Sequence, residues 1–288
     1  MSLVTELPKF VPLRDGPALA GPEHDVADTP AKVVSNQPVN ADYFHMVLEA
    51  DEIAASAKAG QFFNLACPAT TRDMPYLRRP MSVYRAVPGA RRIEFLYKVT
   101  GAGTRGLATV RKGDVLPVLG PLGNGFTLEP QWRNIVVLGR GVGLATLAPL
   151  AEMAASQGIG VTAILSARSR DLVMSVSRFA ECGEHVHVVT DDDGSSAPEH
   201  VEKLLLTLVE AGKAGAFFTC GSNRLMLLMQ RIAKTFDIPG QVAMEQQMAC
   251  GLGMCFCCVR SFQGADGIEQ RRVCSEGPVF ALSEALSW

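Results

Sequence analysis

The cysteines near the C-terminus have a spacing that could hold a metal group. The chain contains eight cysteines, and Cys250, Cys255 and Cys258 form a C-x4-C-x2-C pattern that Cys274 follows after a gap. Three closely spaced cysteines with a distant fourth are typical of plant-type [2Fe–2S] sites. A zinc site, which usually repeats a shorter cysteine pair twice, is the alternative. The sequence therefore predicts a [2Fe–2S] cluster with these four cysteines as its ligands.

The residues between these cysteines fit the same chemistry. Gly251 and Gly253 allow the backbone to wrap closely around a cluster and to direct amide N–H groups at its sulfides. Cys257 lies directly before Cys258. We interpret Cys257 as a bystander, although its thiol could compete as a ligand.

A second motif, Arg79-Pro80-Met81-Ser82, has side chains suited to a dinucleotide. A guanidinium fork matches a pyrophosphate with two hydrogen bonds, and a serine hydroxyl can bond a flavin or a phosphate beside it. An edge strand with solvated arginines is the structural alternative for this stretch. The motif becomes more specific in combination with the next one.

That next motif is Gly103-Thr104, at the start of a short helix that we expect over residues 104–110. The amides of a helix N-terminus can bind an anion, whereas a hairpin turn would use glycine equally well. Together with the arginine motif, this element suggests a flavin dinucleotide bound on a small barrel.

A third motif is the glycine turn formed by Gly139, Gly141 and Gly143. It lies between an apolar run at 134–138 and a helix expected over 144–156, where a nucleotide phosphate could reach the helix N-terminus. Cys220 follows a later strand, and ligands of such sheets bind at the carboxyl ends of the strands. A buried core thiol is the alternative interpretation of Cys220.

The elements that must position these motifs change in character near residue 130. Before it, short β-like runs at roughly regular spacing predict a barrel or sandwich; they lie at 32–35, 44–48, 61–65, 81–84, 93–99 and 115–118. After it, apolar strands alternate with helices, which predicts a doubly wound parallel sheet with helices on both faces; the strands lie at 134–138, 161–165, 185–189 and 215–219, and the helices at 144–156, 201–211 and 225–235.

Length and composition bound the remaining possibilities. The 288 residues carry a net charge of −2 without a long basic run, which argues against a nucleic-acid partner. No apolar stretch approaches the length of a membrane span and the N-terminus lacks a secretory signal, so we expect a cytoplasmic protein. The expected organisation is an extended arm at 1–28, a barrel domain at 29–129, an α/β domain at 130–239 and an iron–sulfur domain at 240–288.

Taken in order, these motifs resemble a ferredoxin-reductase-type module. The C-terminal part is more specific: Glu245-x-x-Met248-Ala249-Cys250-Gly251-Leu252-Gly253-x-Cys255-x-x-Cys258, with Val273-Cys274-x-x-Gly277-Pro278 after it, is similar to the electron-transfer subunit of class 1B dihydroorotate dehydrogenase. The resemblance covers about residues 30–281.

The resemblance implies a set of cofactors and one partner. NAD(P)H would lie over the glycine turn with its nicotinamide near Cys220, where we expect the catalytic exchange with FAD. The cluster would face an FMN-containing dehydrogenase subunit in a hetero-oligomer, and electrons would pass singly through it. The residues that would hold FAD are Arg79, Pro80, Met81, Ser82, Leu96, Tyr97, Lys98, Gly103 and Thr104.

Three departures from the family pattern lie in the nucleotide domain. Arg140 occupies the phosphate turn, where it could add a cation for a phosphate or fill the space of the nucleotide. The loop after Asp191 loses a later glycine, and Ser222 replaces a proline. No acidic residue ends the strand at 161–165, so NADP stays open beside NAD.

Two other functions remain open on the sequence alone. A reductase that feeds an oxygenase uses the same modules, but it would need a complete ferredoxin fold longer than this C-terminal segment. A binding protein with a zinc knuckle and no redox role is the other alternative.

Overall fold

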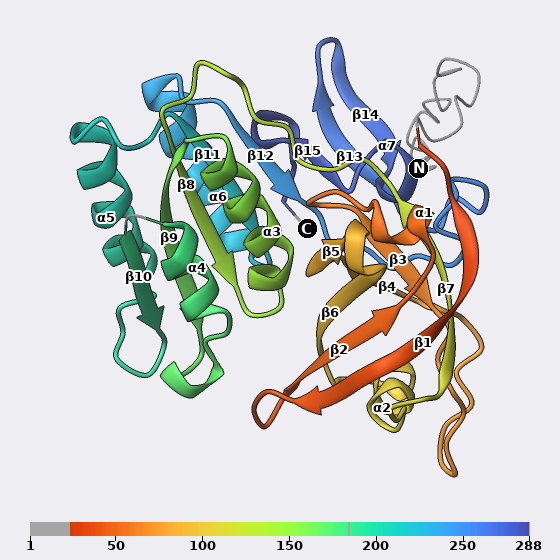
Figure 1. Cartoon of the computed structure of the whole chain (residues 1–288). Coiled ribbons are helices and arrows are strands. Elements are labelled where there is room, and N and C mark those ends of the chain that lie inside the picture. The colour runs from red at the N-terminus through yellow and green to blue at the C-terminus, as the bar shows by residue number, and fades with distance from the viewer. Residues whose placement is uncertain (1–23, 184, 288) are drawn as a thin grey trace, which may run out of the picture.

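The computed structural model describes residues 24–183 and 185–287 (Figure 1). Most of the arm expected over 1–28 therefore lies outside the described residues. Figure 1 shows a curled sheet on the right, a sheet flanked by helices on the left, and a hairpin that projects above their junction. Among the described residues, no helix has the length and apolar character needed to cross a membrane.

The curled sheet has seven antiparallel strands in the order β4-β3-β7-β1-β2-β6-β5. Each expected β-like run overlaps one of its strands, and the short β5 is additional; the strands are β1 (Ala27–Pro38), β2 (Tyr43–Glu49), β3 (Phe62–Leu65), β4 (Arg79–Ser82), β5 (Arg85–Val87), β6 (Arg92–Lys98) and β7 (Val115–Leu122). Helices α1 (Glu52–Ala55) and α2 (Ala102–Ala108) complete this half. The alternating buried positions of β1 and β6 face one apolar core, so the expected barrel is confirmed in the form of a half-barrel.

The second sheet has six strands in the order β10-β9-β8-β11-β12-β15. Its strands are β8 (Asn134–Arg140), β9 (Gly160–Ala167), β10 (His185–Thr190), β11 (Ala216–Cys220), β12 (Gly240–Ala243) and the antiparallel β15 (Val279–Ala281). Helices α3 (Gly143–Ser156) and α4 (Val176–Cys182) cover one face, and α5 (Pro198–Glu210) and α6 (Asn223–Phe236) the other. The doubly wound prediction is confirmed.

The remaining segment runs between the neighbouring strands β12 and β15, of which β15 lies at the edge of the sheet. It contains a loop with three of the four proposed cysteine ligands, the hairpin of β13 (Val259–Gly264) and β14 (Gly267–Arg272), and the short helix α7 (Val273–Glu276). The hairpin explains the long gap before Cys274, because Cys258 precedes β13 and Cys274 lies in α7. Neither hairpin strand was expected from the sequence, because neither has a regular apolar pattern.

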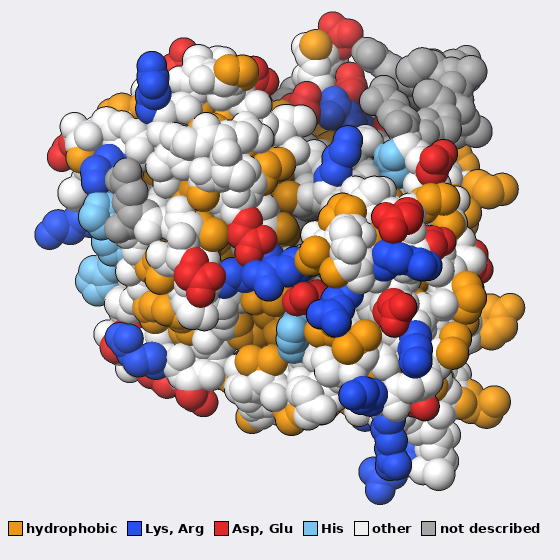
Figure 2. All heavy atoms as spheres, viewed as in Figure 1, with side chains coloured by type: hydrophobic (Ala, Val, Ile, Leu, Met, Phe, Trp, Pro, Cys, Tyr) orange, Lys and Arg blue, Asp and Glu red, His pale blue; other side chains and the backbone are white. Residues whose placement is uncertain are grey.

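An ion-paired cluster that we call the clamp joins the two sheets. Arg178 of α4 is only 5% exposed, and its guanidinium binds both carboxylate oxygens of Glu152 at 2.6 Å. It also donates to the carbonyl oxygen of Tyr84 at 2.6 Å and lies over the Tyr84 ring. Arg85 reaches the same Glu152 carboxylate at 2.9 Å. Figure 2 shows basic and acidic side chains gathered where the two halves meet.

The cysteine segment is attached to the curled sheet mainly by burial. Phe62 of β3 and Leu122 of β7 share one apolar cluster with Met248, Phe262 and Phe280. A backbone hydrogen bond joins Asn124 to Gly277, and the side chain of Asn64 donates to the Cys250 carbonyl. This boundary therefore contains few charges among the described residues.

Candidate functional site

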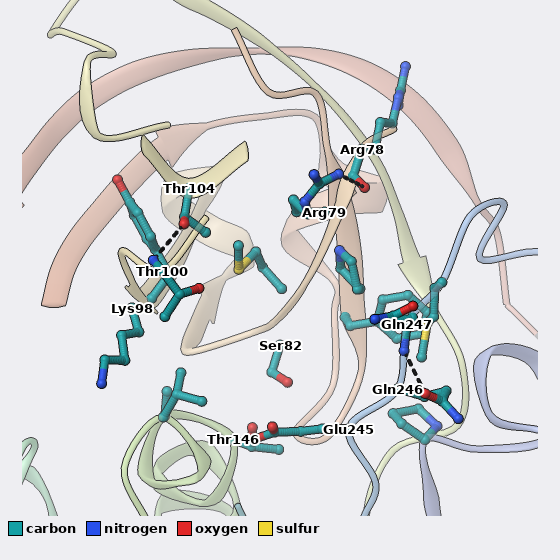
Figure 3. A pocket seen from close by; sticks show the side chains of 18 of the residues that line it. Arg78, Arg79, Ser82, Lys98, Thr100, Thr104, Thr146, Glu245, Gln246 and Gln247 are labelled. Atoms are coloured by element: carbon teal, nitrogen blue, oxygen red, sulfur yellow. Dashed lines mark hydrogen bonds between the residues drawn. The ribbon is translucent and has the colours of Figure 1, made fainter. Parts of the chain in front are cut away.

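A cavity of about 920 Å³ lies where the three parts of the molecule meet. Its walls come from β4 and β6 of the curled sheet, from the first turn of α3, and from residues 244–248 that follow β12. Figure 3 shows these walls around one open space. A volume of this size is at the upper end of small-molecule sites, as a large cofactor requires.

The arginine motif forms one wall of the cavity, where Arg79, Pro80, Met81 and Ser82 all line it. Arg79 lies against Gly103, and a Cβ atom on that glycine would be 2.7 Å from the Arg79 Nε. Among the described residues its hydrogen bonds go to the carbonyls of Leu77 and Arg78 rather than to a carboxylate. The guanidinium thus has its positive charge at the cavity wall, which fits a pyrophosphate.

Thr104 lines the cavity beside this arginine. Its hydroxyl accepts from the backbone amides of Thr100 and Gly101 at 2.9 and 3.1 Å, which fixes the turn before α2. Figure 3 shows the bond to Thr100. The structure therefore brings the two expected flavin motifs together, although Gly103 supports Arg79 from behind rather than lining the cavity itself.

The expected wall on β6 is also present, with side chains that point in different directions. Leu96, Tyr97 and Lys98 line the cavity. The Tyr97 hydroxyl donates to Asn36 inside the half-barrel, and burial raises the pKa of this phenol. Lys98 forms an ion pair with Asp42 at 3.0 Å.

The glycine turn lies at the switch point of the parallel sheet, between β8 and β11. Gly139 pairs directly with Cys220, and a Cβ atom on Gly143 would lie 2.4 Å from the Cys220 carbonyl oxygen. Gly141 has a positive φ of 56°. Close packing and a left-handed backbone thus require glycine here, and the turn brings four expected nucleotide residues together.

Glu245 is a cavity residue to which the sequence analysis assigned no role. Burial raises the pKa of its carboxyl group above the usual value. Figure 3 shows Glu245, Ser82 and Thr146 lining the cavity, and Thr146 forms a hydrogen bond with Cys220. In the sequence, only the position of Glu245 just before the cysteine motif indicated that this residue could matter. Burial also raises the pKa of Cys220, with Glu245 adding to the effect.

The four proposed cysteine ligands form two pairs of thiols. Cys250 is hydrogen bonded to Cys255, and Cys258 to Cys274. Within the described ranges, no three His, Cys, Asp or Glu side chains converge on a position for one metal ion. A binuclear cluster takes two thiolates on each iron, so an arrangement of two pairs fits it.

Backbone amides point at these sulfur atoms. Leu252 donates to Cys250 at 3.3 Å, Gly253 to Cys274 at 3.1 Å, and the Cys274 amide to Cys258 at 3.4 Å. Gly253 has a φ of 79°, so the expected tight wrapping is present. Cys257 is exposed, and its thiol lies 3.8 Å from the Gln247 carbonyl oxygen, outside both pairs.

These contacts make the thiols of Cys250 and Cys258 more acidic, and a cluster needs thiolate ligands. Burial raises the pKa of Cys250, but amide hydrogen bonds outweigh it and lower that pKa to about 7. The hydrogen bond from Cys274 lowers the pKa of Cys258 to about 6, and the same contact raises the pKa of Cys274. The buried Ser275 hydroxyl, which has no partner in the described structure, lies beside Gly253. These donors fit a sulfide-containing group.

Comparisons with known proteins agree with this geometry. Residues 245–285 match the family described as the iron-sulfur cluster binding domain of dihydroorotate dehydrogenase B. The chain is 31% identical over 250 residues to the "Dihydroorotate dehydrogenase B (NAD(+)), electron transfer subunit" of Desulforamulus reducens, covering 87% of this chain and 95% of that protein. The Streptococcus pneumoniae protein of the same name is 32% identical over 86% of this chain and 94% of its own length.

Solved structures give the same result for the fold. The protein described in "Insights into flavin-based electron bifurcation via the NADH-dependent reduced ferredoxin-NADP oxidoreductase structure" superimposes with a TM-score of 0.74 and 26% identity, over 90% of each chain. A ferredoxin reductase of carbazole 1,9a-dioxygenase, at 19% identity and a TM-score of 0.60, shares the fold over 75% of this chain and 66% of its own. With identity above 30% over nearly the whole length of its relatives, this chain belongs to the family of dihydroorotate dehydrogenase B electron-transfer subunits.

Proposed function

We propose that the chain passes electrons between NAD(H) and an FMN-containing dihydroorotate dehydrogenase subunit, through FAD and a [2Fe–2S] cluster. This activity belongs to pyrimidine biosynthesis, and a cytoplasmic location suits its free cysteines, which persist in a reducing compartment. We assign the three domains to residues 29–129, 130–239 and 240–288.

One observation carries the proposal. The cavity is closed by residues 244–248, and this segment leads directly into Cys250, the first of the paired cysteines. The switch point of the nucleotide sheet meets the same cavity through Thr146 and Glu245. Sites for FAD, nucleotide and cluster therefore adjoin one another, as a relay requires.

In this scheme, the residues of the chain bind and orient FAD. Arg79 would bind the FAD pyrophosphate, and Ser82 would face the flavin ring. Burial raises the pKa of the Glu245 carboxyl group and so favours its neutral form, which can donate a hydrogen bond to a bound ring. FAD supplies the exchange between paired and single electrons when it is bound.

The surface around the cluster cysteines suits a protein partner. Leu252, Met254 and Phe256 are 43%, 75% and 46% exposed beside the exposed Cys255. Methionine and aromatic side chains are enriched at the centres of protein interfaces. We propose that the FMN-containing subunit covers this surface, which would shorten the path from the cluster to FMN.

The test is anaerobic purification of the full chain, alone and with a candidate FMN subunit. We expect FAD, iron and sulfide in the chain, and flavin bleaching by NADH followed by an EPR signal of a reduced cluster. With the partner, dihydroorotate should reduce the same cluster. Zinc in place of iron would support the alternative of a zinc-knuckle binding protein. Electron transfer to an oxygenase instead of the FMN subunit would support the alternative of an oxygenase reductase.

A further inference from the structure

The side chain of Arg140 extends over the carboxyl ends of β9 and β10. Its Nη1 atom donates to Ser166 Oγ at 2.8 Å, and its two terminal nitrogens bind the Asp191 carboxylate at 3.1 and 2.6 Å. Ser166 is the penultimate residue of β9, and Asp191 directly follows β10. An arginine and an aspartate therefore meet at the edge of the sheet where a nucleotide would bind.

The strand order determines which part of a nucleotide would meet this pair. The cavity touches the start of α3 and the segment after β12, so a nicotinamide reaches FAD from the β11 side of Gly139. The pyrophosphate would lie at the start of α3. The adenosine half then extends the other way, over the ends of β9 and β10, which brings its ribose to Arg140 and Asp191.

The charges of Arg140 and Asp191 determine whether the site favours a hydroxyl or a phosphate at the 2′-position of that ribose. An acidic residue binds a free 2′-hydroxyl in such sites, whereas an arginine accommodates a 2′-phosphate. Hydrogen bonds from Arg140 and Ser196 lower the pKa of Asp191, which is therefore ionised at neutral pH. Alone, this carboxylate would repel a phosphate, but its charge is balanced by Arg140.

Arg140 also has capacity for a second anion. Its side chain is 24% exposed, and within the described residues no hydrogen bond engages its Nε–H. Guanidinium groups carry five N–H donors, so a carboxylate on one edge leaves another edge available. Two further cations lie nearby: Arg168 is exposed directly after β9, and Arg224 donates to the Ser196 carbonyl at 3.2 Å.

We propose that Arg140 binds the 2′-phosphate of NADPH, so that this chain accepts electrons from NADPH as well as from NADH. The inference rests on the proposed nucleotide role of the sheet, and it adds a specificity-determining residue to it. Arg140 would share its guanidinium between Asp191 and the phosphate.

Anaerobic stopped-flow reduction of FAD in the holoprotein by NADH and by NADPH tests this inference. The variants are Arg140→Ala, Arg140→Lys, Asp191→Asn and, as a matched control, Arg133→Ala, because Arg133 is exposed directly before the opposite end of the strand that Arg140 ends. FAD content and dithionite reduction of each variant report its folding. The quantity compared is the ratio of kcat/KM for NADPH to that for NADH.

Wild-type protein should be reduced by both nucleotides. Arg140→Ala should lower the NADPH-to-NADH ratio about tenfold or more, as the loss of a charge-assisted phosphate contact predicts, and Arg140→Lys should recover part of it. Asp191→Asn should raise the ratio, and Arg133→Ala should leave it unchanged. A wild-type protein reduced by NADH alone, or a ratio that Arg140→Ala does not change, would overturn the inference and leave the proposed function intact. Failure of both nucleotides to reduce a loaded FAD would instead overturn the proposed nucleotide role itself.

Discussion

Two boundaries enclose the cavity, and they are made of different contacts. On the nucleotide side, the buried Arg178 binds Glu152 and Tyr84 with geometry that depends on a few charged atoms. On the cluster side, apolar packing around Phe62, Phe262 and the cysteines is supplemented by backbone hydrogen bonds. A charged boundary fixes one orientation through directional bonds, whereas an apolar boundary depends on area and on the cluster itself.

The cluster side should respond most strongly to loss of its metal. Cys255→Ser should abolish the EPR signal of the dithionite-reduced cluster, since one iron loses a ligand. FAD reduction by NADH should continue, because the clamp is untouched. Cys257→Ser is the control and should keep the signal. An unchanged spectrum in Cys255→Ser would contradict the ligand assignment.

A substitution in the cavity wall should weaken FAD binding. Arg79→Ala should lower FAD affinity by about tenfold or more, because the pyrophosphate loses a bidentate cation. Flavin content and titration of the flavin-depleted protein measure this. Arg72→Ala, an exposed arginine in the preceding loop, is the matched control. Full flavin retention in Arg79→Ala would argue against this residue as a phosphate ligand.

The nucleotide side should respond to loss of the clamp. Arg178→Met should slow FAD reduction by saturating NADH by about tenfold, because small misplacements of reacting groups are costly. It should also lower the unfolding temperature by about 5 °C, since it removes the bidentate partner of a partly buried carboxylate and leaves only the more exposed Arg85 beside it. Dithionite reduction of FAD and cluster should not change.

Arg85→Ala provides the matched control for the clamp. Arg85 contacts the same carboxylate from a side chain that is 40% exposed, so its loss should have little effect. Equal effects of the two variants would indicate that charge near Glu152, rather than the buried geometry of Arg178, holds the domains.

The smallest effect is expected at Asn64. Its amide donates to the Cys250 carbonyl at 3.1 Å, and its Oδ1 atom is buried without a partner in the described structure. Asn64→Ala should keep the cluster but speed iron release to a chelator about fivefold, the effect of losing one hydrogen bond of about 1 kcal/mol. Asn36→Ala, which removes a partly buried amide elsewhere in the sheet, should not change iron release.

The sequence was most informative where a local pattern specifies backbone conformation. Alternating and continuous apolar runs predicted the two sheets, and glycine spacing predicted the turn at the switch point. The clamp could not be predicted, because Arg178 and Glu152 are distant from Tyr84 in sequence and meet only after the domains pack. Glu245 was missed for a similar reason: its burial depends on three separate segments. The hairpin was missed because its strands lack an apolar pattern.

The pairing of β12 with β15 has a consequence for cluster assembly. The cysteine segment leaves β12 after Ala243 and rejoins the sheet in β15 at Val279, and these two residues pair with each other. The pairing of these two strands thus joins the ends of the segment. Strand pairing has already restricted the conformations of the loop, so cluster binding loses less entropy. It also holds the four thiols at a high effective concentration for an incoming cluster. Metal insertion then has to order only a loop that is tethered at both ends.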